Sequence, residues 1–322
     1  MQKSLNIING SALLSLMKNA HIAGDFLAWN DFLHEGPVPK ELSLDERSLH
    51  RIKFIYQLKL AELSTIESTF QKRNSILKEH QNYRKVRLWF EADLYDQLQL
   101  LEILSWLATH RYDSTQYTLI LTHKYLGELT PHELKRLLRY EQKITAPQFE
   151  LAKTAWSAFT DTTPLKWHEL HHKSTSILPF LKPTIKRMLE EYPSTINGLS
   201  RTAHQALLLI NKGEENPKEI FLKSQAYESY KFMGDLLFQK VLDEFIAYNL
   251  VESQQSGQKL TITPLGEELL VGRESWLNLK PIDRWIGGVH LTPDNLWCWN
   301  IEEKSIKKYY FSKSLSSLLE VN

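Results

Sequence analysis

The fold is decided by residues 5–31, which read LNIINGSALLSLMKNAHIAGDFLAWND. An apolar run at 5–8 ends in a small polar turn at 9–11, and apolar residues then recur at helical spacing over 12–18. A second strand-like run covers 26–29. The order strand, turn, helix, strand is the beginning of a βαβ unit, so the sequence predicts a parallel sheet.

The same alternation continues outward along the chain. Strand-like runs at 86–90 and 117–121 flank a strongly apolar helix that starts at Leu94. Ser43-Leu-Asp-Glu46 has the pattern of a capping box, which predicts a further helix start. We therefore expect an α/β, Rossmann-like domain over residues 1–145.

The remainder of the chain is first helical and then mixed. Residues 146–195 predict a helical connector, and residues 196–322 predict a winged-helix-like domain with a terminal β element. The second prediction depends on the order of three helices, an extended segment and two strand-rich segments, at 201–211, 217–225, 235–248, 258–262, 287–300 and 308–311.

The composition of the 322 residues excludes several classes of protein. Lys and Arg number 39 against 38 Asp and Glu, and a net charge of +1 gives no general affinity for polyanions. The single cysteine, Cys298, cannot form an internal disulfide, so we expect a cytoplasmic protein. No apolar run reaches the length of about 18 residues that a membrane helix needs, so no membrane partner is expected.

Several stretches are similar to the Domain of Unknown Function 1835 family of bacterial proteins. The resemblance implies the domain layout above and no particular reaction. Family members often have Asp where Ser11 stands here and a basic residue near Cys298. The similar stretches are residues 8–11 (INGS), 29–37 (WNDFLHEGP), 88–97 (LWFEADLYDQ), 178–181 (LPFL), 197–202 (NGLSRT) and 282–291 (IDRWIGGVHL).

Three loops carry the residues of the predicted site, because ligands of open α/β sheets bind beyond the carboxyl ends of the strands. We expect the protein to bind a small phosphorylated or nucleotide-like molecule there, and the sequence leaves open whether it also turns this molecule over. The acidic residues could hold Mg²⁺ through oxygen, and a helix N-terminus could hold phosphate. The candidate ligand-binding residues are Asn9, Gly10, Ser11, Trp29, Asp31, Glu91, Asp96 and Gln97, and the candidate catalytic residues are His34, Glu35 and Asp93.

Each of these residues also has a structural interpretation. Residues 9–11 could be a turn before a helix, and Asp93 could be the N-cap of the helix that starts at Leu94. His34 to Pro37 could form a structural turn, and a tryptophan such as Trp29 at a strand end usually belongs to a core.

Two other functions are open on the sequence alone. The C-terminal domain could be an adaptor or a transcription-related regulator that contacts a protein partner. Nucleic acid is the less expected partner, because residues 196–322 contain 14 Lys and Arg against 16 Asp and Glu. The remote alternative is a zinc peptidase, because His168-Glu169-Leu-His-His172 contains the spacing of two metal-binding histidines, to which Glu190 or Glu191 could add a third ligand.

Overall fold

The computed structural model describes residues 3–254, 257–312 and 317–320. The chain forms two compact units, which we treat separately. Unit 1 comprises residues 1–184 together with Gly287–Val289, and unit 2 comprises residues 185–286 and 290–322. The predicted α/β class is confirmed, since a mainly parallel sheet is combined with helices.

Unit 1 is built on a five-stranded sheet with the strand order β2-β1-β4-β5-β6. Neighbouring strands are parallel except for β6, which runs antiparallel to β5. Four of the strands fall on the predicted runs, where apolar side chains are buried. The five strands of the sheet are β1 (Ser4–Ile8), β2 (Asp25–Ala28), β4 (Lys85–Glu91), β5 (Gln116–Thr122) and β6 (Gln142–Lys143), of which β6 was not predicted.

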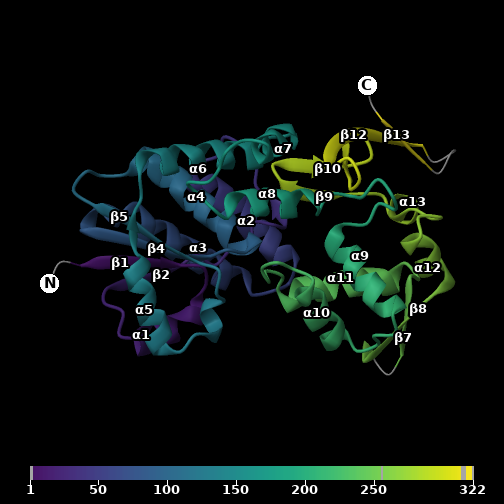
Figure 1. Cartoon of the computed structure of the whole chain (residues 1–322), viewed down its shortest axis with the longest axis horizontal. Coiled ribbons are helices and arrows are strands. Elements are labelled where there is room, and N and C mark those ends of the chain that lie inside the picture. The colour runs from purple at the N-terminus through teal and green to yellow at the C-terminus, as the bar shows by residue number, and fades with distance from the viewer. Residues whose placement is uncertain (1–2, 255–256, 313–316, 321–322) are drawn as a thin grey trace. The chain divides into compact units, whose positions relative to one another are not determined.

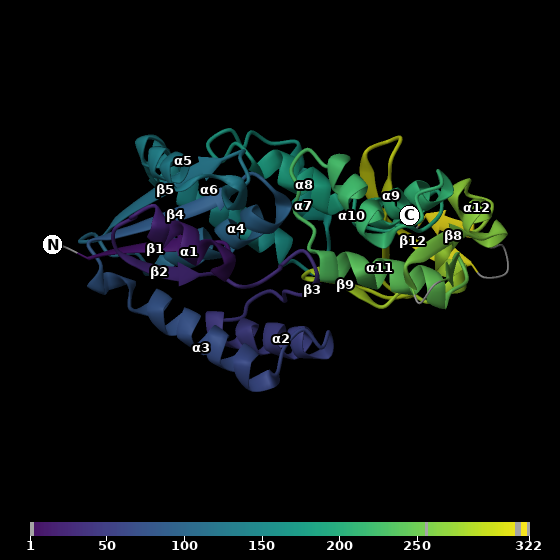
Figure 2. The same cartoon turned by 90° about the horizontal axis from the view of Figure 1, so that it is seen from below.

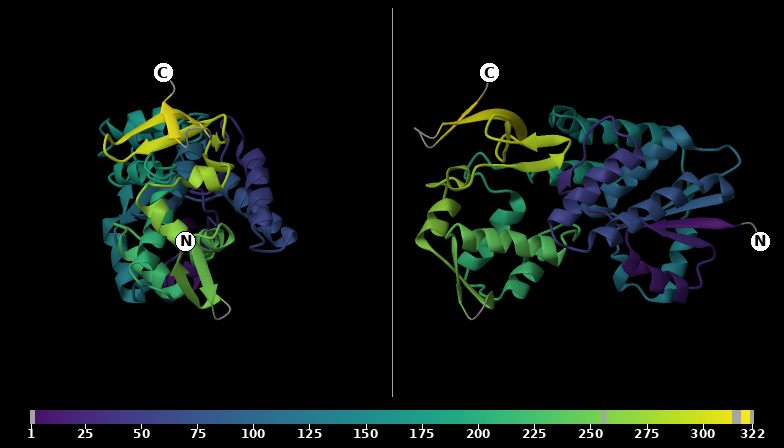
Figure 3. Two further views of the ribbon diagram at one scale, coloured as in Figure 1. Left: turned by 90° about the vertical axis from the view of Figure 1, so that its right-hand side faces the viewer. Right: turned by 180° about the vertical axis from the view of Figure 1, so that it is seen from behind.

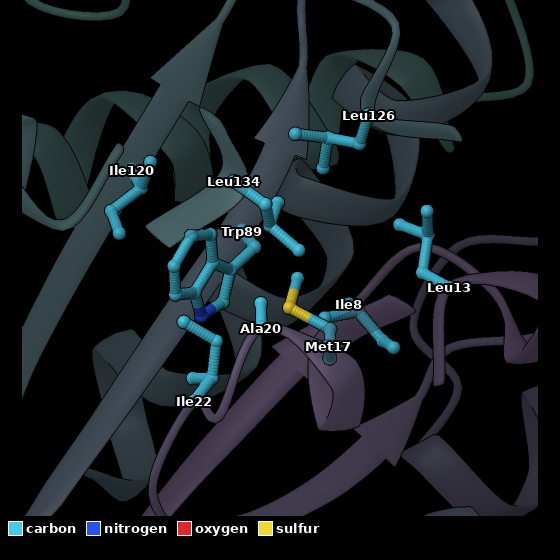
Figure 4. Close-up of a cluster of buried hydrophobic side chains, with 9 residues drawn as sticks. All are labelled: Ile8, Leu13, Met17, Ala20, Ile22, Trp89, Ile120, Leu126 and Leu134. Atoms are coloured by element: carbon cyan, nitrogen blue, oxygen red, sulfur yellow. The ribbon is translucent and has the colours of Figure 1, made fainter. Parts of the chain in front are cut away.

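Helices cover both faces of this sheet (Figure 1). On one face lie α1 (Leu14–Asn19) and α5 (Pro131–Arg136), and on the other lie α4 (Leu94–His110) and α6 (Ala146–Phe159). Figure 4 shows the core beneath α1 and α5, where Trp89 is surrounded by aliphatic side chains from strands and helices. Burial of this apolar surface holds the helical layer on the sheet.

A helical pair precedes β4 in the chain. It consists of α2 (Leu44–Gln57) and α3 (Leu63–Lys78), which pack against each other and are visible side by side in Figure 2. The predicted capping box is confirmed, because the Ser43 hydroxyl accepts the Glu46 N–H and the Glu46 carboxylate accepts the Ser43 N–H.

The end of unit 1 lies within the predicted connector. Helix α6, followed by α7 (Leu165–His171), belongs to this unit because it packs along α4. Three later residues also belong to it: the Gly287 carbonyl accepts the Val38 N–H at 2.8 Å, and the Gly288 N–H donates to the Phe159 carbonyl at 3.0 Å.

Unit 2 begins within α8 (Leu181–Leu189) and continues as three helices and a hairpin (Figure 3). The helices are α9 (Arg201–Asn211), α10 (Pro217–Ala226) and α11 (Asp235–Ala247). Strands β7 (Val251–Gln254) and β8 (Lys259–Ile262) pair antiparallel. Strand β7 was not predicted, because three of its four residues are exposed and only its first is buried, which leaves no apolar pattern.

Short elements complete the chain. The predicted strand-rich segments at 287–300 and 308–311 contain strands, and a strand outside them, β13, completes an antiparallel sheet in the order β11-β12-β13. The elements are β3 (Gly36–Pro37), α12 (Pro264–Leu270), α13 (Trp276–Leu279), β9 (Arg284–Gly287), β10 (Val289–Leu291), β11 (Leu296–Asn300), β12 (Ser305–Ser312) and β13 (Ser317–Glu320).

Candidate functional site

The topology places the predicted ligand site between the carboxyl ends of β1 and β4. The chain moves from β1 to β2 on one side and later to β4 on the other, so the strand order reverses at β1. Here the Asn9 side chain donates to Asp96 Oδ1 at 2.6 Å. The structure thus brings Asn9, Glu91, Asp93, Asp96 and Gln97 together, and the position where a ligand was expected is bridged by protein side chains.

Each carboxylate of this group is engaged in shaping the loop after β4. Asp93 is the N-cap of α4 and accepts the Asp96 N–H at 3.0 Å, as the structural interpretation of Asp93 predicted. Asp96 Oδ2 accepts the Glu91 N–H at 2.5 Å, and Glu91 Oε1 accepts the Leu126 N–H at 3.0 Å. Gln97 donates to the Glu91 carbonyl. We call Glu91, Asp93 and Asp96 the acidic network.

Burial raises the pKa values of all three members of the acidic network. Burial and the charge of Asp93 raise the pKa of Glu91 to about 8. Burial raises the pKa of Asp93 to about 7, against hydrogen bonds that lower it, and the pKa of Asp96 also lies well above its usual range. Protons are therefore retained in this network near neutral pH.

The acidic network does not fit a metal ion or a large ligand. The side chains are enclosed, with Glu91, Asp93 and Asp96 only 4%, 5% and 0% exposed. Their oxygens already accept N–H groups, and the described residues include no group of three or more His, Cys, Asp or Glu arranged to hold a metal. The predicted Mg²⁺ therefore has no arrangement of ligands here.

The turn after β1 serves the local structure. The Ser11 N–H donates to the Asn30 side chain at 2.9 Å, which ties the loops after β1 and β2 together. Gly10 has extended backbone, and the 3₁₀ turn at Ser11–Leu13 has no side-chain cap. The Ser11 side chain is exposed, and the turn that it begins leads only into the six-residue α1, so residues 9–11 form a turn as the structural interpretation predicted, and a phosphate site there stays a prediction.

Trp29 and Asp31 lie inside unit 1 instead of at its surface. Asp31 is 1% exposed, and its carboxylate forms an ion pair with the Arg51 guanidinium at 2.9 Å. The Trp29 indole N–H donates to Glu102 at 2.8 Å, and the Arg73 guanidinium lies 4.1 Å from the Trp29 ring centre. These groups form a buried ionic cluster that holds α2 and α3, and they are not available to a ligand at the edge.

His34 and Glu35 form part of a structural turn. The His34 ring is buried between Phe32 and Tyr95, with ring centres 6.3 and 6.0 Å away. The Glu35 backbone carbonyl accepts a hydrogen bond from the Arg51 guanidinium at 2.7 Å. Gly36 has φ = +80°, and a Cβ there would overlap the Phe54 ring, so the turn requires glycine. The expected acid or base at position 34 is enclosed by aromatic rings.

A pocket that the sequence did not reveal lies at the carboxyl end of β5. It has a volume of about 850 Å³ and extends to α5, β6 and the segment around Ile177. We call it the β5 pocket. Its lining residues are Leu119, Leu121, Thr122, His123, Lys124, Glu133, Arg136, Leu137, Tyr140, Gln142, Lys143, Thr145, Gln148, Ser176, Ile177, Pro179 and Phe180.

The β5 pocket carries an excess of positive charge. Lys124, Arg136 and Lys143 form no ion pair within the described part of the chain. The one acidic lining residue, Glu133, accepts the Thr130 N–H and hydroxyl in a capping box. These bonds, and further the charges of Lys124 and Arg136, lower the pKa of Glu133. The sequence signal for this pocket is the set of basic residues between positions 124 and 143, and these residues follow no motif.

The histidines of the zinc-peptidase alternative lie near each other. His168 Nε2 and His172 Nε2 are 3.4 Å apart on the exposed side of α7. Glu191 is paired with Arg187 at 2.7 Å and Glu190 with Arg201 at 2.6 Å, so both are engaged elsewhere. Within the described ranges no third ligand joins the histidines.

No protein-family model and no curated protein matches the chain. The resemblance to the Domain of Unknown Function 1835 family therefore stays a prediction, as does a cytoplasmic location. None of the described helices combines the length and apolarity needed to cross a bilayer.

Proposed function

We propose that the protein binds a small phosphorylated molecule in the β5 pocket. The proposal rests on three cationic side chains, Lys124, Arg136 and Lys143, which line this pocket at the carboxyl end of β5. Arg and Lys are the usual protein partners of phosphate, and Arg can bind it through two parallel hydrogen bonds. The ligand class expected from the sequence is thereby retained, and its location moves from the loops after β1, β2 and β4 to the end of β5.

The charge distribution favours this location over the acidic network. A phosphate dianion next to Glu91, Asp93 and Asp96 would face carboxyl groups that form no ion pair with a Lys, Arg or His of the described residues. In the β5 pocket the only carboxylate, Glu133, is outnumbered three to one and is held by its helix cap. An anion therefore gains attraction there from several side chains.

The apolar and aromatic residues that line the β5 pocket indicate that the ligand carries an organic group in addition to its phosphate. Tyr140 and Ile177 are 65% and 44% exposed, and they line the pocket with Pro179 and Phe180. Such apolar and aromatic surface is suited to a sugar or a base attached to the phosphate. Binding is the part of the predicted function that the geometry supports, because none of the candidate catalytic residues lines this pocket.

Isothermal titration calorimetry with ribose 5-phosphate and AMP tests the proposal. We expect measurable binding of both by the wild type and none of ribose. The double variant Lys124→Gln/Arg136→Gln should bind at least tenfold more weakly, since each lost charge-assisted hydrogen bond removes about 1.5–3 kcal/mol. Lys135→Gln is the matched control, because it changes a charge on α5 outside the pocket.

Two results would contradict this function. One is the absence of binding heat with either phosphorylated probe. The other is equal affinity of the double variant and the wild type.

The finer fold assignments are proposals that rest on element order. We infer a Rossmann-like unit 1 from the strand order and a winged-helix-like arrangement from the succession α9, α10, α11, β7 and β8. A regulator or adaptor role of this second region, and a protein partner for it, stay predictions. Retention of the chain on heparin that falls with salt would favour nucleic acid as the partner.

A further inference from the structure

A second pocket of unit 1 lies between helices, apart from the predicted site and from the β5 pocket. Its volume is about 770 Å³, and none of the candidate residues of the sequence lines it. We call it the helical pocket. Its walls are the segment 39–47 at the start of α2, the end of α3 with His80, the second half of α4 and the second half of α6.

Aromatic rings form one end of the helical pocket. Trp106 and His110 are stacked with ring centres 4.2 Å apart and planes 1° from parallel. His80 lies edge-on to Trp106 at 5.4 Å, and Tyr112, which is 46% exposed, lies 5.2 Å from His80. Trp156 on α6 lines the same pocket. Flat π surfaces of this kind stack on other planar rings.

Hydrogen-bonding groups without protein partners lie among these rings. His80 Nδ1 is 2.7 Å from the Leu77 carbonyl, so Nδ1 carries the proton and Nε2 is an acceptor. Nε2 is buried and has no hydrogen-bond partner in the described structure. The hydroxyls of Ser105 and Ser157 likewise have no partner within the described ranges. Donors and acceptors on the edge of a planar ring would satisfy such groups.

The charges of the helical pocket are largely balanced, in contrast to the β5 pocket. Arg47 is paired with Glu102 at 2.6 Å, and Lys78 is paired with Asp45. Of the lining cations only Lys153 forms no ion pair in the described part of the chain. A neutral ligand therefore fits this site better than a strongly anionic one.

From these observations we infer that the helical pocket binds an uncharged planar nitrogen heterocycle of nucleobase size. Trp106 provides the stacking surface, and His80, Ser105 and Ser157 provide hydrogen bonds to the ring edge. The Trp156 ring, which is 7% exposed and has the Arg47 guanidinium 5.0 Å from its centre, forms a wall of the site. This site is separate from the β5 pocket and does not depend on the function proposed there.

Saturation-transfer NMR on the full-length protein tests the inference with adenine, cytosine and nicotinamide as probes. We expect saturation transfer to at least one of them with the wild type. Ser157→Tyr should weaken that binding at least tenfold, because the new ring fills the pocket from an exposed position of α6. Thr154→Tyr is the matched control on the same helix, at an exposed residue outside the pocket, and should bind as the wild type does.

A second pair of variants separates this site from the β5 pocket. Trp106→Ala should lose binding, and Lys124→Gln/Arg136→Gln should keep it. The inference is overturned if none of the probes receives saturation, if Ser157→Tyr binds as well as the wild type, or if the double variant loses the heterocycle.

Discussion

Buried carboxylates occur in both units of the protein, and their partners differ. In unit 1 the acidic network is surrounded by N–H groups, and burial raises its pKa values. In unit 2, Glu191 is 2% exposed, and its carboxylate contacts Arg187 at 2.7 Å and Arg284 at 3.1 Å. Burial alone would raise the pKa of Glu191, but Arg187 and then Arg284 lower it to about 2. Burial thus does not decide whether a carboxyl group is charged; the neighbouring cations do.

The two arrangements also differ in how much depends on one residue. Arg187 donates to Glu228 at 2.8 and 2.9 Å, to Glu191 at 2.7 Å and to the Thr202 hydroxyl at 2.8 Å. No single side chain in the acidic network has a comparable set of partners. We therefore expect unit 2 to respond most strongly to loss of one residue, and unit 1 to respond most strongly to pH.

The largest effect is expected from Arg187→Met. The change leaves Glu191 and Glu228 buried without their shared cation, and loss of one partner of a buried pair costs about 3–5 kcal/mol. The free energy of unfolding from urea denaturation, followed by circular dichroism, measures it. Lys186→Met is the control, because Lys186 is half-exposed and lies 3.8 Å from Glu190. Equal losses in the two variants would show that the Arg187 network does not stabilise unit 2.

An intermediate effect with a defined pH dependence is expected from Glu91→Gln. The raised pKa of Glu91 means that the folded state holds a proton which the unfolded state releases. The protonated Glu91 therefore stabilises the folded state fully at pH values below the pKa of Glu91 in the unfolded chain. This stabilisation is lost as the pH rises through the pKa of the folded state, about 8. The amide cannot ionise, so the variant should match the wild type at pH 4 and exceed it at pH 9, by about 1.4 kcal/mol for each pH unit that separates the folded and unfolded pKa values of Glu91.

Denaturation curves at several pH values measure this difference, with Glu67→Gln as a control at an exposed position of α3. A constant difference between Glu91→Gln and the wild type from pH 4 to 9 would argue against a protonated acidic network.

The smallest effect is expected from the pair Asp93→Ala and Asp93→Asn. Both remove the titrating carboxyl group, but asparagine can still accept the Asp96 N–H as an N-cap of α4. Asp93→Ala should therefore be less stable than Asp93→Asn by about 1 kcal/mol at any pH. Thermal unfolding of the two variants side by side measures the difference, and identical midpoints would mean that the cap contributes nothing.

Local patterns predicted much of the fold and little of the site. Short apolar runs located β1 and β4, and the spacing Ser43 to Glu46 located the start of α2, because these features depend on residues close in sequence. The partner of Asp31, which lies in the loop after β2, is Arg51 on α2, 20 residues further along the chain. No pattern in one sequence links such a pair, and the availability of Asp31 to a ligand could therefore not be predicted.

The same limit applies to the pockets. Asp93 was open to two interpretations, and only the position of the Asp96 N–H distinguishes them. Lys124, Arg136 and Lys143 come from the loop after β5, from α5 and from β6, and the pairing of β6 with β5 helps to bring them to one pocket. The polar residues conspicuous in the sequence hold loops in shape, and the cations that remain unpaired are inconspicuous.

The contribution of Gly287–Val289 to unit 1 has a consequence for how the protein is made. A Cβ at Gly288 would overlap the Thr160 carbonyl, so this short segment is fitted closely against the end of α6. Translation delivers residues 1–184 well before residue 287, and N-terminal domains generally fold first. The nascent first unit must therefore wait, with the Val38 N–H and the Phe159 carbonyl lacking their final partners, until the ribosome has synthesised most of the second.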